Sequence, residues 1–311
     1  MRIKDKIKRP RRPVVVYEIL PPRKKDGTLN SYAENISSLL SQTHIDAINI
    51  PEVRDEVARG ERPVKNQIRA EPREFGKLLQ DIVGIEAIVN RVVVHQELEK
   101  EMEWFEETYT NFEIENLITV GGESRKIKYP GPSVNKALKA IKDDSKLDIL
   151  CGGISIPSRE KESLNLIEKS TNGSEFFTTQ VLYDSSKIIK MISHYQKRCD
   201  EQGTFPRRLL LSFAPVSSKK NIDFLKWLGV EIPVGTESFL NENEKNMVER
   251  SMEISVGVLK DTLSFLNENK IVVPIGLNVE HIMSYNFQSS IEMLQELARI
   301  YREFCIKTDI Y

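Results

Sequence analysis

The chain has 311 residues, of which 40% are hydrophobic and 29% are charged, so it holds enough apolar material for one large core. This composition excludes a chain that is disordered throughout. Its 45 Lys and Arg residues nearly balance its 46 Asp and Glu residues, so no overall charge attracts it to nucleic acid or to an acidic membrane. Apolar runs such as residues 271–275 are far shorter than the roughly 20 residues that span a bilayer, and no signal sequence is visible. We expect a soluble, cytoplasmic protein.

Neither the cysteines nor the histidines form a metal-binding pattern. Cys151, Cys199 and Cys305 are widely spaced and odd in number, which does not indicate a disulfide framework or a zinc cluster. The four histidines contain no HxxxH or HxH pair. The sequence therefore predicts no metal site.

The first 13 residues are strongly basic, with seven Lys and Arg residues against the single acid Asp5, and they end in Pro13. Such a run predicts a solvated arm, with weak anion binding as an alternative. We therefore divide the chain into a basic arm, residues 1–13, and one catalytic domain, residues 14–311.

Short runs rich in β-branched residues alternate along the domain with longer stretches whose apolar residues recur at helical spacing. This alternation predicts parallel strands joined by crossover helices. The eight predicted strands are residues 14–19, 46–51, 87–94, 116–120, 148–155, 176–183, 208–214 and 272–278.

Eight such units favour an α/β fold, namely a single closed (β/α)₈ TIM barrel, which typically has about 250 residues. An open doubly wound sheet is the alternative. Residues 230–268 are too many for one crossover, so we expect an extra helix before the last strand, for instance residues 241–265. Ser133 and Asp184 stand where helix N-caps are expected.

Polar residues interrupt several strands near their carboxyl ends, where barrels of this class place their active sites. Glu18 is the sharpest case, because it shares a face with Val14 and Val16 and because Pro21 and Pro22 follow the strand. It is either half of an ion pair or a carboxyl group whose raised pKa lets it act as a general acid. The other polar residues at these positions are Asn49, Glu52, Asn90, Arg91, Glu123, Gln180, Asn278 and Glu280.

Two further features of the strand ends each have two interpretations. The amide of Gln180 needs partners for its donor and its acceptor, which either a heterocycle or a neighbouring strand would supply. Gly121 and Gly122 either let the backbone approach a flat or phosphorylated ligand or make a tight turn. The pair lacks the GxGxxG and GK[ST] spacings, so neither a dinucleotide motif nor a P-loop is indicated.

Three collinear segments resemble the catalytic barrel of the methylenetetrahydrofolate reductase family, over nearly all of residues 14 to about 300. VVYEILPPR, residues 15–23, is similar to that family's first-strand motif. LNLIEK to FTTQVLYD, residues 164–184, is similar to its fifth helix and sixth strand. LSFAPVSSKKNIDFLKWLGVEIP, residues 211–233, follows its seventh strand and the segment beyond.

This resemblance implies a flavoprotein oxidoreductase of one-carbon metabolism and methionine biosynthesis. In it FAD, reduced by NADH or NADPH, passes a hydride to 5,10-methylenetetrahydrofolate, or to a related methylene-pterin, and yields the 5-methyl form. The resemblance places Glu18 at the acid that opens the five-membered ring and Gln180 at the glutamine that binds the pterin. Glu123 replaces an aspartate that lies beside flavin and pterin.

The resemblance also implies a set of FAD-binding positions. Tyr129 aligns with a tyrosine after the fourth strand, and Lys169 aligns with a lysine of the fifth crossover helix. Glu162 stands where an aspartate binds the ribityl or adenosine part. Gly122 falls in the family's Arg-Gly-Asp motif, and Asn90 falls at its third-strand histidine.

Several departures from the family keep two alternatives open. The Arg-Gly-Asp motif reads GGE at residues 121–123, Pro51 stands at a threonine position, and residues 154–159 replace a longer loop. One alternative is a flavin-free barrel that binds a pterin and transfers its methyl group, or acts as a partner-dependent subunit. The other is a noncatalytic scaffold. The family is also compatible with a homo-oligomer or an electron-donating partner protein.

Overall fold

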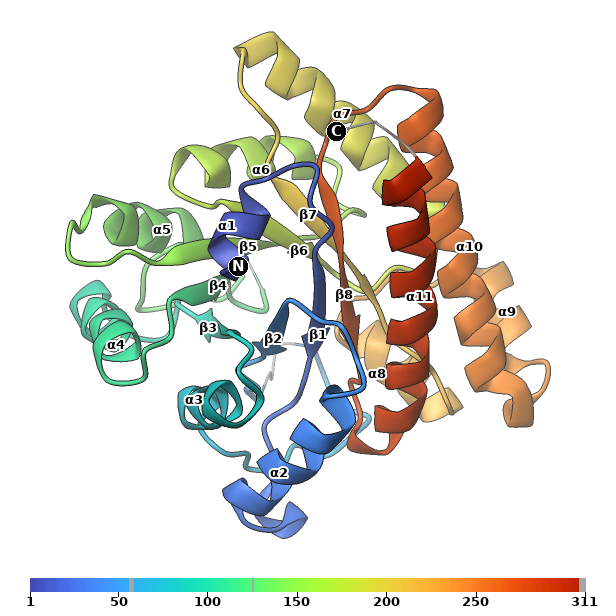
Figure 1. The fold of residues 1–311 in the computed structure, drawn as a ribbon, viewed down its shortest axis with the longest axis horizontal. Coiled ribbons are helices and arrows are strands. Elements are labelled where there is room, and N and C mark those ends of the chain that lie inside the picture. Colours follow the sequence, from blue (N-terminus) through green and yellow to red (C-terminus); the bar gives the residue numbers. More distant parts are fainter. Residues whose placement is uncertain (56–58, 125, 308–311) are drawn as a thin grey trace.

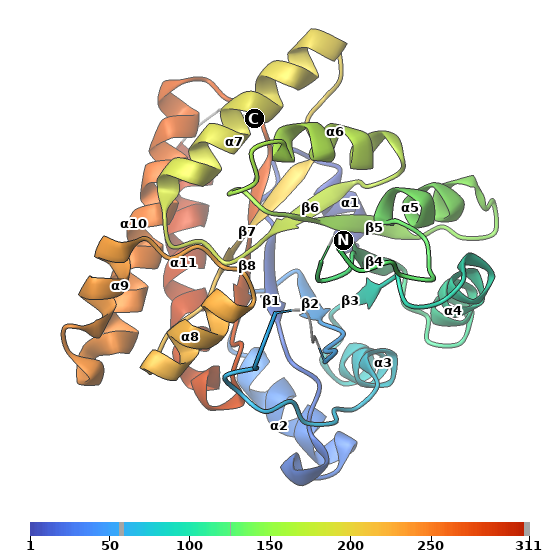
Figure 2. The same cartoon turned by 180° about the vertical axis from the view of Figure 1, so that it is seen from behind.

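The computed structural model describes residues 1–55, 59–124 and 126–307. Eight parallel strands pair in sequence order, and β8 closes onto β1 to form a barrel with helices around it (Figure 1, Figure 2). The strands are β1 (Val15–Glu18), β2 (Ala47–Ile50), β3 (Ala87–Val92), β4 (Asn116–Val120), β5 (Leu150–Ser155), β6 (Phe176–Thr179), β7 (Arg208–Phe213) and β8 (Ile275–Glu280). The predicted (β/α)₈ barrel is confirmed.

Two of the helices that cover the outside of the barrel begin at the N-caps expected from the sequence. Ser133 accepts a hydrogen bond from the backbone of Lys136, and Asp184 accepts one from Ser186, as expected for N-caps. Within the described residues, no helix has both the length and the apolar character needed to cross a bilayer. The helices are α2 (Leu29–Leu40), α3 (Pro72–Val83), α4 (Leu98–Thr110), α5 (Val134–Asp143), α6 (Glu162–Thr171), α7 (Ser185–Gln202), α8 (Lys219–Trp227), α9 (Val234–Asn241), α10 (Met247–Glu268) and α11 (Phe287–Lys307).

The segment before the last strand differs in detail from the prediction. Two helices, α9 and α10, lie between α8 and β8, where one extra helix was expected. The last strand begins at Ile275 rather than at residue 272, since Pro274 has no N–H for the sheet. It also continues to Glu280, which pairs in register with Glu18 of β1. This register brings a second carboxyl group to the end of the barrel.

Alternate residues of each strand face the lumen, and these fill its lower part with apolar side chains. Val14 and Val16 belong to this inner cluster, whereas Val15 and Tyr17 pack in the larger core under the helices. Glu18 follows Val14 and Val16 at a spacing of two residues and therefore belongs to the inner face. The polar mouth thus lies directly above closely packed apolar side chains that fill the lumen.

The first part of the basic N-terminus is folded onto the barrel, whereas residues 8–12 are exposed. A short helix, α1 (Ile3–Ile7), lies across the end of the barrel opposite the mouth, and its two isoleucines are 1% and 4% exposed. Both pack into the inner cluster with Val14 and Phe176. The expectation of a solvated arm is wrong for this segment, because its isoleucines recur at i, i+4 and form one buried face.

The basic residues of this segment bind the barrel itself. Lys4 pairs with Asp148 and Lys6 pairs with Asp46, while Arg2 and Lys8 reach Glu115 and Glu175. The buried Arg208 of β7 donates hydrogen bonds to backbone carbonyls in this segment, among them those of residues 7, 9 and 10. These contacts pair four of the seven basic residues of the segment with acids of the barrel.

Shortening the buried side chain of α1 tests this packing. Ile7→Ala should lower the free energy of unfolding by about 2–4 kcal/mol, because a buried isoleucine loses its contacts and leaves a cavity. Urea denaturation followed by circular dichroism measures the change. The matched control is Ile306→Ala, whose side chain is 84% exposed. Equal effects of the two substitutions would show that α1 does not seal the barrel.

Candidate functional site

The carboxyl ends of the strands enclose a cavity of about 730 Å³. Its lining comes from segments that are distant in sequence, as expected for the mouth of a closed barrel. The predicted site residues that line it are Glu18, Asn90, Gly122, Glu123, Tyr129, Lys169 and Gln180. The structure thus brings all but one of the eight predicted residues to one place, and the exception is Glu162.

Two carboxyl groups lie side by side at the point where the barrel closes. Glu18 ends β1, Glu280 ends β8, and the two residues are register partners on adjacent strands. The Nδ2 of Asn49 donates to Glu18 Oε2 at 2.6 Å, and the Nδ2 of Asn278 donates to Glu280 Oε1 at 3.1 Å. Across the described part of the chain, neither carboxyl group forms an ion pair, which argues against the ion-pair interpretation of Glu18.

This arrangement favours a retained proton. Burial and the neighbouring charge of Glu280 raise the pKa of Glu18 well above its ordinary value, against the opposing effect of hydrogen bonds from Asn278 and Asn49. Burial likewise raises the pKa of Glu280. Two adjacent carboxyl groups that have no ion-pair partner among the described residues cannot both ionise easily, so each affects the titration of the other. The pair is therefore able to donate a proton near neutral pH.

Sequence analysis noted Glu280 as a polar residue but gave it no role. Its signal was its spacing of two residues from Asn278, which puts both on the inner face of one strand. What the sequence did not show is that β8 pairs with β1 in the register that sets Glu280 beside Glu18.

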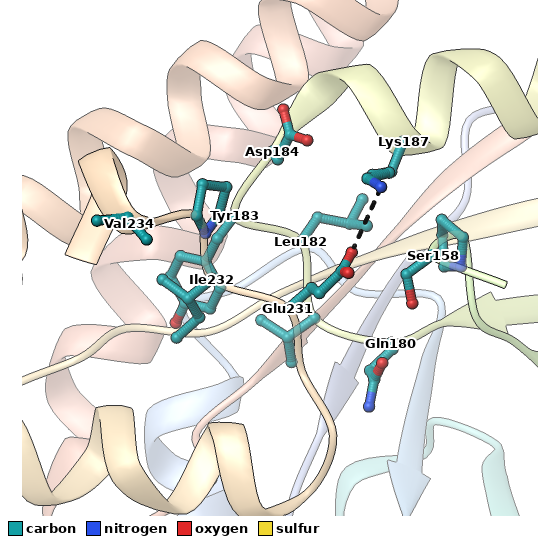
Figure 3. Close-up of a pocket in the computed structure, with 12 residues that line it drawn as sticks. Ser158, Gln180, Leu182, Tyr183, Asp184, Lys187, Glu231, Ile232 and Val234 are labelled. Carbon is teal, nitrogen blue, oxygen red and sulfur yellow. Dashed lines mark ion pairs between the residues drawn. The ribbon is translucent and has the colours of Figure 1, made fainter.

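Gln180 lies between the mouth cavity and a second groove. The groove has a volume of about 400 Å³ and runs between the start of α7 and residues 231–234 (Figure 3). Across it Lys187 and Glu231 face each other, with 3.9 Å between charged atoms. The Nε2 of Gln180 donates to the carbonyl of Leu228 at 3.1 Å. One donor of the amide is therefore used within the chain, and the contact with a pterin stays a prediction.

The glycine at position 122 makes room for a tyrosine of the same chain. A Cβ added to Gly122 would lie 2.3 Å from the ring of Tyr129. That ring also meets His95 edge-on, with ring centroids 5.4 Å apart. Close approach of a ligand is thus not needed to explain the glycine, although both Gly122 and Tyr129 line the cavity.

Glu162 and Lys169 are engaged with each other and with the backbone. Glu162 is fully buried and accepts hydrogen bonds from the N–H of Ile156 at 3.1 Å and from Asn165 at 2.8 Å. The Nζ of Lys169 lies 3.6 Å from Glu162 and donates to the carbonyl of Ile154 at 2.5 Å. The structure does not bring Glu162 to the cavity, whereas Lys169 lines its wall.

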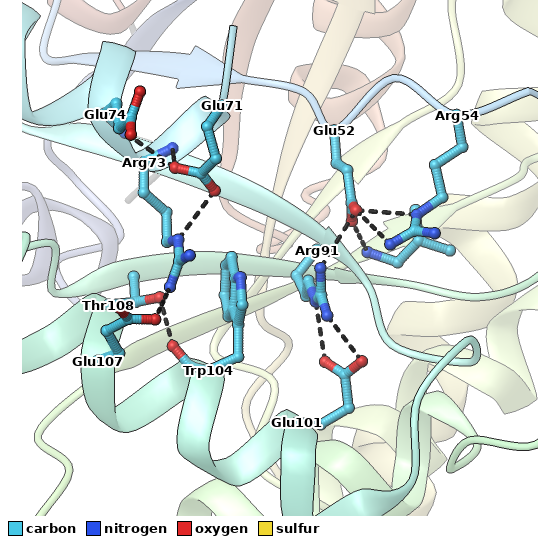
Figure 4. Close-up of polar contacts among 11 residues, drawn as sticks. Glu52, Arg54, Glu71, Arg73, Glu74, Arg91, Glu101, Trp104, Glu107 and Thr108 are labelled. Atoms are coloured by element: carbon cyan, nitrogen blue, oxygen red, sulfur yellow. Dashed lines mark hydrogen bonds and ion pairs between the residues drawn. The ribbon is translucent and has the colours of Figure 1, made fainter.

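Two other polar residues of the strand ends have a structural role. Arg91 turns outward, where its guanidinium pairs with both oxygens of the fully buried Glu101 of α4 at 2.9 Å (Figure 4). Glu52 accepts from Arg91 at 3.2 Å and from the N–H of Val92 at 2.7 Å. Trp104 lies between Arg91 and Arg73, each 4.6 Å from a ring centroid. This cluster ties β2 and β3 to α4.

Neither a family model nor a curated protein matches this chain. A similar solved structure is that of an uncharacterized protein from Clostridium thermocellum that binds two copies of 5-methyl-5,6,7,8-tetrahydrofolic acid. The two chains are 22% identical, the match covers 96% of this chain and 99% of that chain, and the TM-score is 0.79. At this identity the similarity establishes a shared fold.

The buried ion pair of Arg91 and Glu101 yields a stability prediction. Glu101→Gln should lower the free energy of unfolding by about 1.5–3 kcal/mol, because the buried guanidinium loses the carboxylate that it contacts at two positions and keeps only Glu52. The double variant Arg91→Met with Glu101→Leu should recover much of this loss. Denaturant titrations measure both. As a control, Glu296→Gln removes an exposed partner of Arg299 and should cost less than about 1 kcal/mol. A Glu101→Gln loss no larger than that would contradict the structural role.

Proposed function

We propose that this chain binds a reduced folate at the barrel mouth and reduces its 5,10-methylene unit to the 5-methyl form, with Glu18 as the general acid. The observation that carries the proposal is the position of Glu18, which lines the cavity beside a second carboxyl group. A carboxyl group so placed keeps its proton near neutral pH and can give it to a ring nitrogen. The similar protein that binds 5-methyltetrahydrofolate supports a folate as the ligand.

The chemistry assigned to the chain is a proton transfer followed by hydride acceptance. The proton of Glu18 moves to the bridging nitrogen of the methylene-folate while the carbon–nitrogen bond breaks toward that nitrogen. The ring then opens to a cationic iminium carbon, which accepts a hydride. Two carboxyl groups beside this cation stabilise it electrostatically. Gln180 and Glu123 line the same cavity and would orient the pterin.

We propose FAD as the hydride carrier, supplied in turn by NADH or NADPH. Asn90, Tyr129 and Lys169 line the mouth and would hold it. The Oδ1 of Asn90 is buried and has no hydrogen-bond partner in the described part of the chain, so a flavin N–H would satisfy it. Bound FAD would supply the hydride. Glu162 does not fit a role in FAD binding, because its carboxyl group is fully buried and already accepts hydrogen bonds from the N–H of Ile156 and from Asn165.

A second candidate is a flavin-free barrel that binds the reduced folate and transfers its methyl group, or that serves a partner protein. The observation in its favour is that the chain's own groups occupy several positions expected to contact flavin. Tyr129 covers Gly122, and Lys169 binds Glu162 and the backbone. In this candidate the carboxyl pair protonates the pterin, and the wider cavity accepts the methyl-receiving group.

The absorption spectrum of the native protein separates the two candidates, together with calorimetric titration of 5-methyltetrahydrofolate. A flavin spectrum or FAD uptake, combined with folate binding, supports the reductase. A colourless protein that ignores FAD but binds folate supports the second candidate. If the protein binds no folate either with or without FAD, both candidates are contradicted.

The role of Glu18 is tested by Glu18→Gln, which keeps the size of the side chain and removes the transferable proton. Methylene-folate reduction should fall at least about 100-fold, the usual contribution of a general acid, while folate affinity changes little. Steady-state kinetics and calorimetry measure the two quantities. Glu99→Gln, an exposed change on α4, is the matched control. Undiminished turnover in Glu18→Gln would exclude it as the acid.

A further inference from the structure

We infer that Glu280 is the second half of the acid, so that Glu18 and Glu280 hold one proton between them and together bind the cationic form of the ligand. The consequence for the ligand rests on the proposed function. The shared proton itself is a property of the free protein and is tested without any ligand.

The geometry of the closing strands sets the pair. Glu18 and Glu280 are register partners on neighbouring parallel strands, which lie about 4.8 Å apart. Both line the mouth cavity, so both can reach a ligand there. Both also line a second cavity, of about 270 Å³, whose other lining residues include Arg69 after β2 and Tyr285 after β8. Asn49 donates to Glu18, whereas Asn278 donates to Glu280 and also interacts with Glu18. The hydroxyl of Ser212 interacts with Glu280 as well. Asn278 therefore bridges the two carboxyl groups, which suits a pair that shares a proton.

Two buried amide oxygens beside the pair lack a hydrogen-bond donor. The side-chain oxygens of Asn49 and Asn278 are buried and lack a partner in the described part of the chain. Both residues are 1% exposed, so water does not easily satisfy these oxygens. The amide N–H groups of the same residues are already directed at the carboxyl groups. One carboxyl O–H supplies the donor that this cluster needs.

The surrounding charges do not remove the proton. Burial lowers the pKa of His281 to about 3 and raises the pKa of Tyr183, so both side chains are neutral near pH 7. Arg54 is paired with Glu52. No cation of the described chain forms an ion pair with Glu18 or Glu280. The charged side chains that line these cavities are Arg23, Glu52, Arg54, Arg59, Arg62, Lys65 and Arg69 after β1 and β2, Glu123 after β4, and Arg159, Glu168 and Lys169 before and on α6.

The pair links proton transfer to ligand charge. Before transfer it carries one proton and one negative charge. When Glu18 gives its proton to a ligand nitrogen, the pair gains one negative charge and the ligand gains one positive charge, so the total is unchanged. The repulsion between the carboxylates is then relieved by the new cation. The site therefore selects nitrogen heterocycles that become cationic on protonation.

The test is a pH titration of the ligand-free full chain labelled with ¹³C at the glutamate carboxyl carbons. Glu18→Gln and Glu280→Gln assign the two signals. In the wild type, one of the two groups should titrate well above an ordinary glutamate. In Glu280→Gln, the midpoint of Glu18 should fall by at least about one pH unit, because the neighbouring charge is gone. Glu280→Asp should keep the high midpoint, and the control Glu99→Gln should leave it unchanged.

Two results would overturn the inference: ordinary midpoints for both groups in the wild type, or the same Glu18 midpoint with and without Glu280. Folate binding plays no part in this titration. If it fails while Glu18→Gln still abolishes reduction, Glu18 acts alone and the proposed function stands. If the titration succeeds but no folate binds, the pair exists and serves a different ligand.

Thermal unfolding provides a second readout that needs no signal assignment. The pair has a pKa above the unfolded value of about 4.3 for Glu, so the folded state binds more protons and stability falls as pH rises through that interval. Glu280→Gln reduces this loss, because only one buried carboxyl group remains and the charge beside it is gone. The melting temperature of Glu280→Gln minus that of the wild type should therefore increase as the pH is raised from 5 to 8. A difference that stays constant over this range would contradict the shared proton.

Discussion

The register between the first and last strands is the constraint on which the site depends. A closed barrel leaves no freedom in how β8 meets β1, and the observed register sets Glu18 directly beside Glu280. Two buried carboxyl groups with no cation repel each other strongly when both are ionised. The least costly state is one in which the pair keeps a proton. This single electrostatic cost links the barrel geometry to the proposed acid chemistry.

The rest of the molecule holds this arrangement rigid. Asn49 and Asn278 direct their amide groups at the carboxyl pair, and apolar side chains fill the lumen beneath it. At the opposite end, α1 closes the barrel with its two isoleucines. The buried cluster of Arg91 and Glu101 fixes the outer side of β3 against α4. A site that stores unfavourable charge requires such support, because its own contribution to stability decreases as pH rises.

Much of this architecture is readable in the sequence, because it is local. The alternation of short β-branched runs with helical spacing revealed eight strands, and the proline pair after Glu18 marked it as a residue of the mouth. The pairing of Glu280 with Glu18 could not be predicted, because the register between β8 and β1 depends on contacts between residues that are far apart in the sequence. Arg91 was expected at the mouth with Asn90, but adjacent residues of a strand face opposite sides. The many basic residues around α1 led to the prediction of a solvated arm, although its two isoleucines are buried.

Infrared difference spectroscopy on the wild-type protein at pH 7 detects the shared proton itself, because a protonated carboxyl group has a C=O band separate from that of carboxylates. We expect such a band in the free protein. The band should weaken in both Glu18→Gln and Glu280→Gln, because the charge of the neighbouring carboxyl group is gone, and it should also diminish when a folate that accepts the proton binds. A free protein without a protonated carboxyl band would contradict the account.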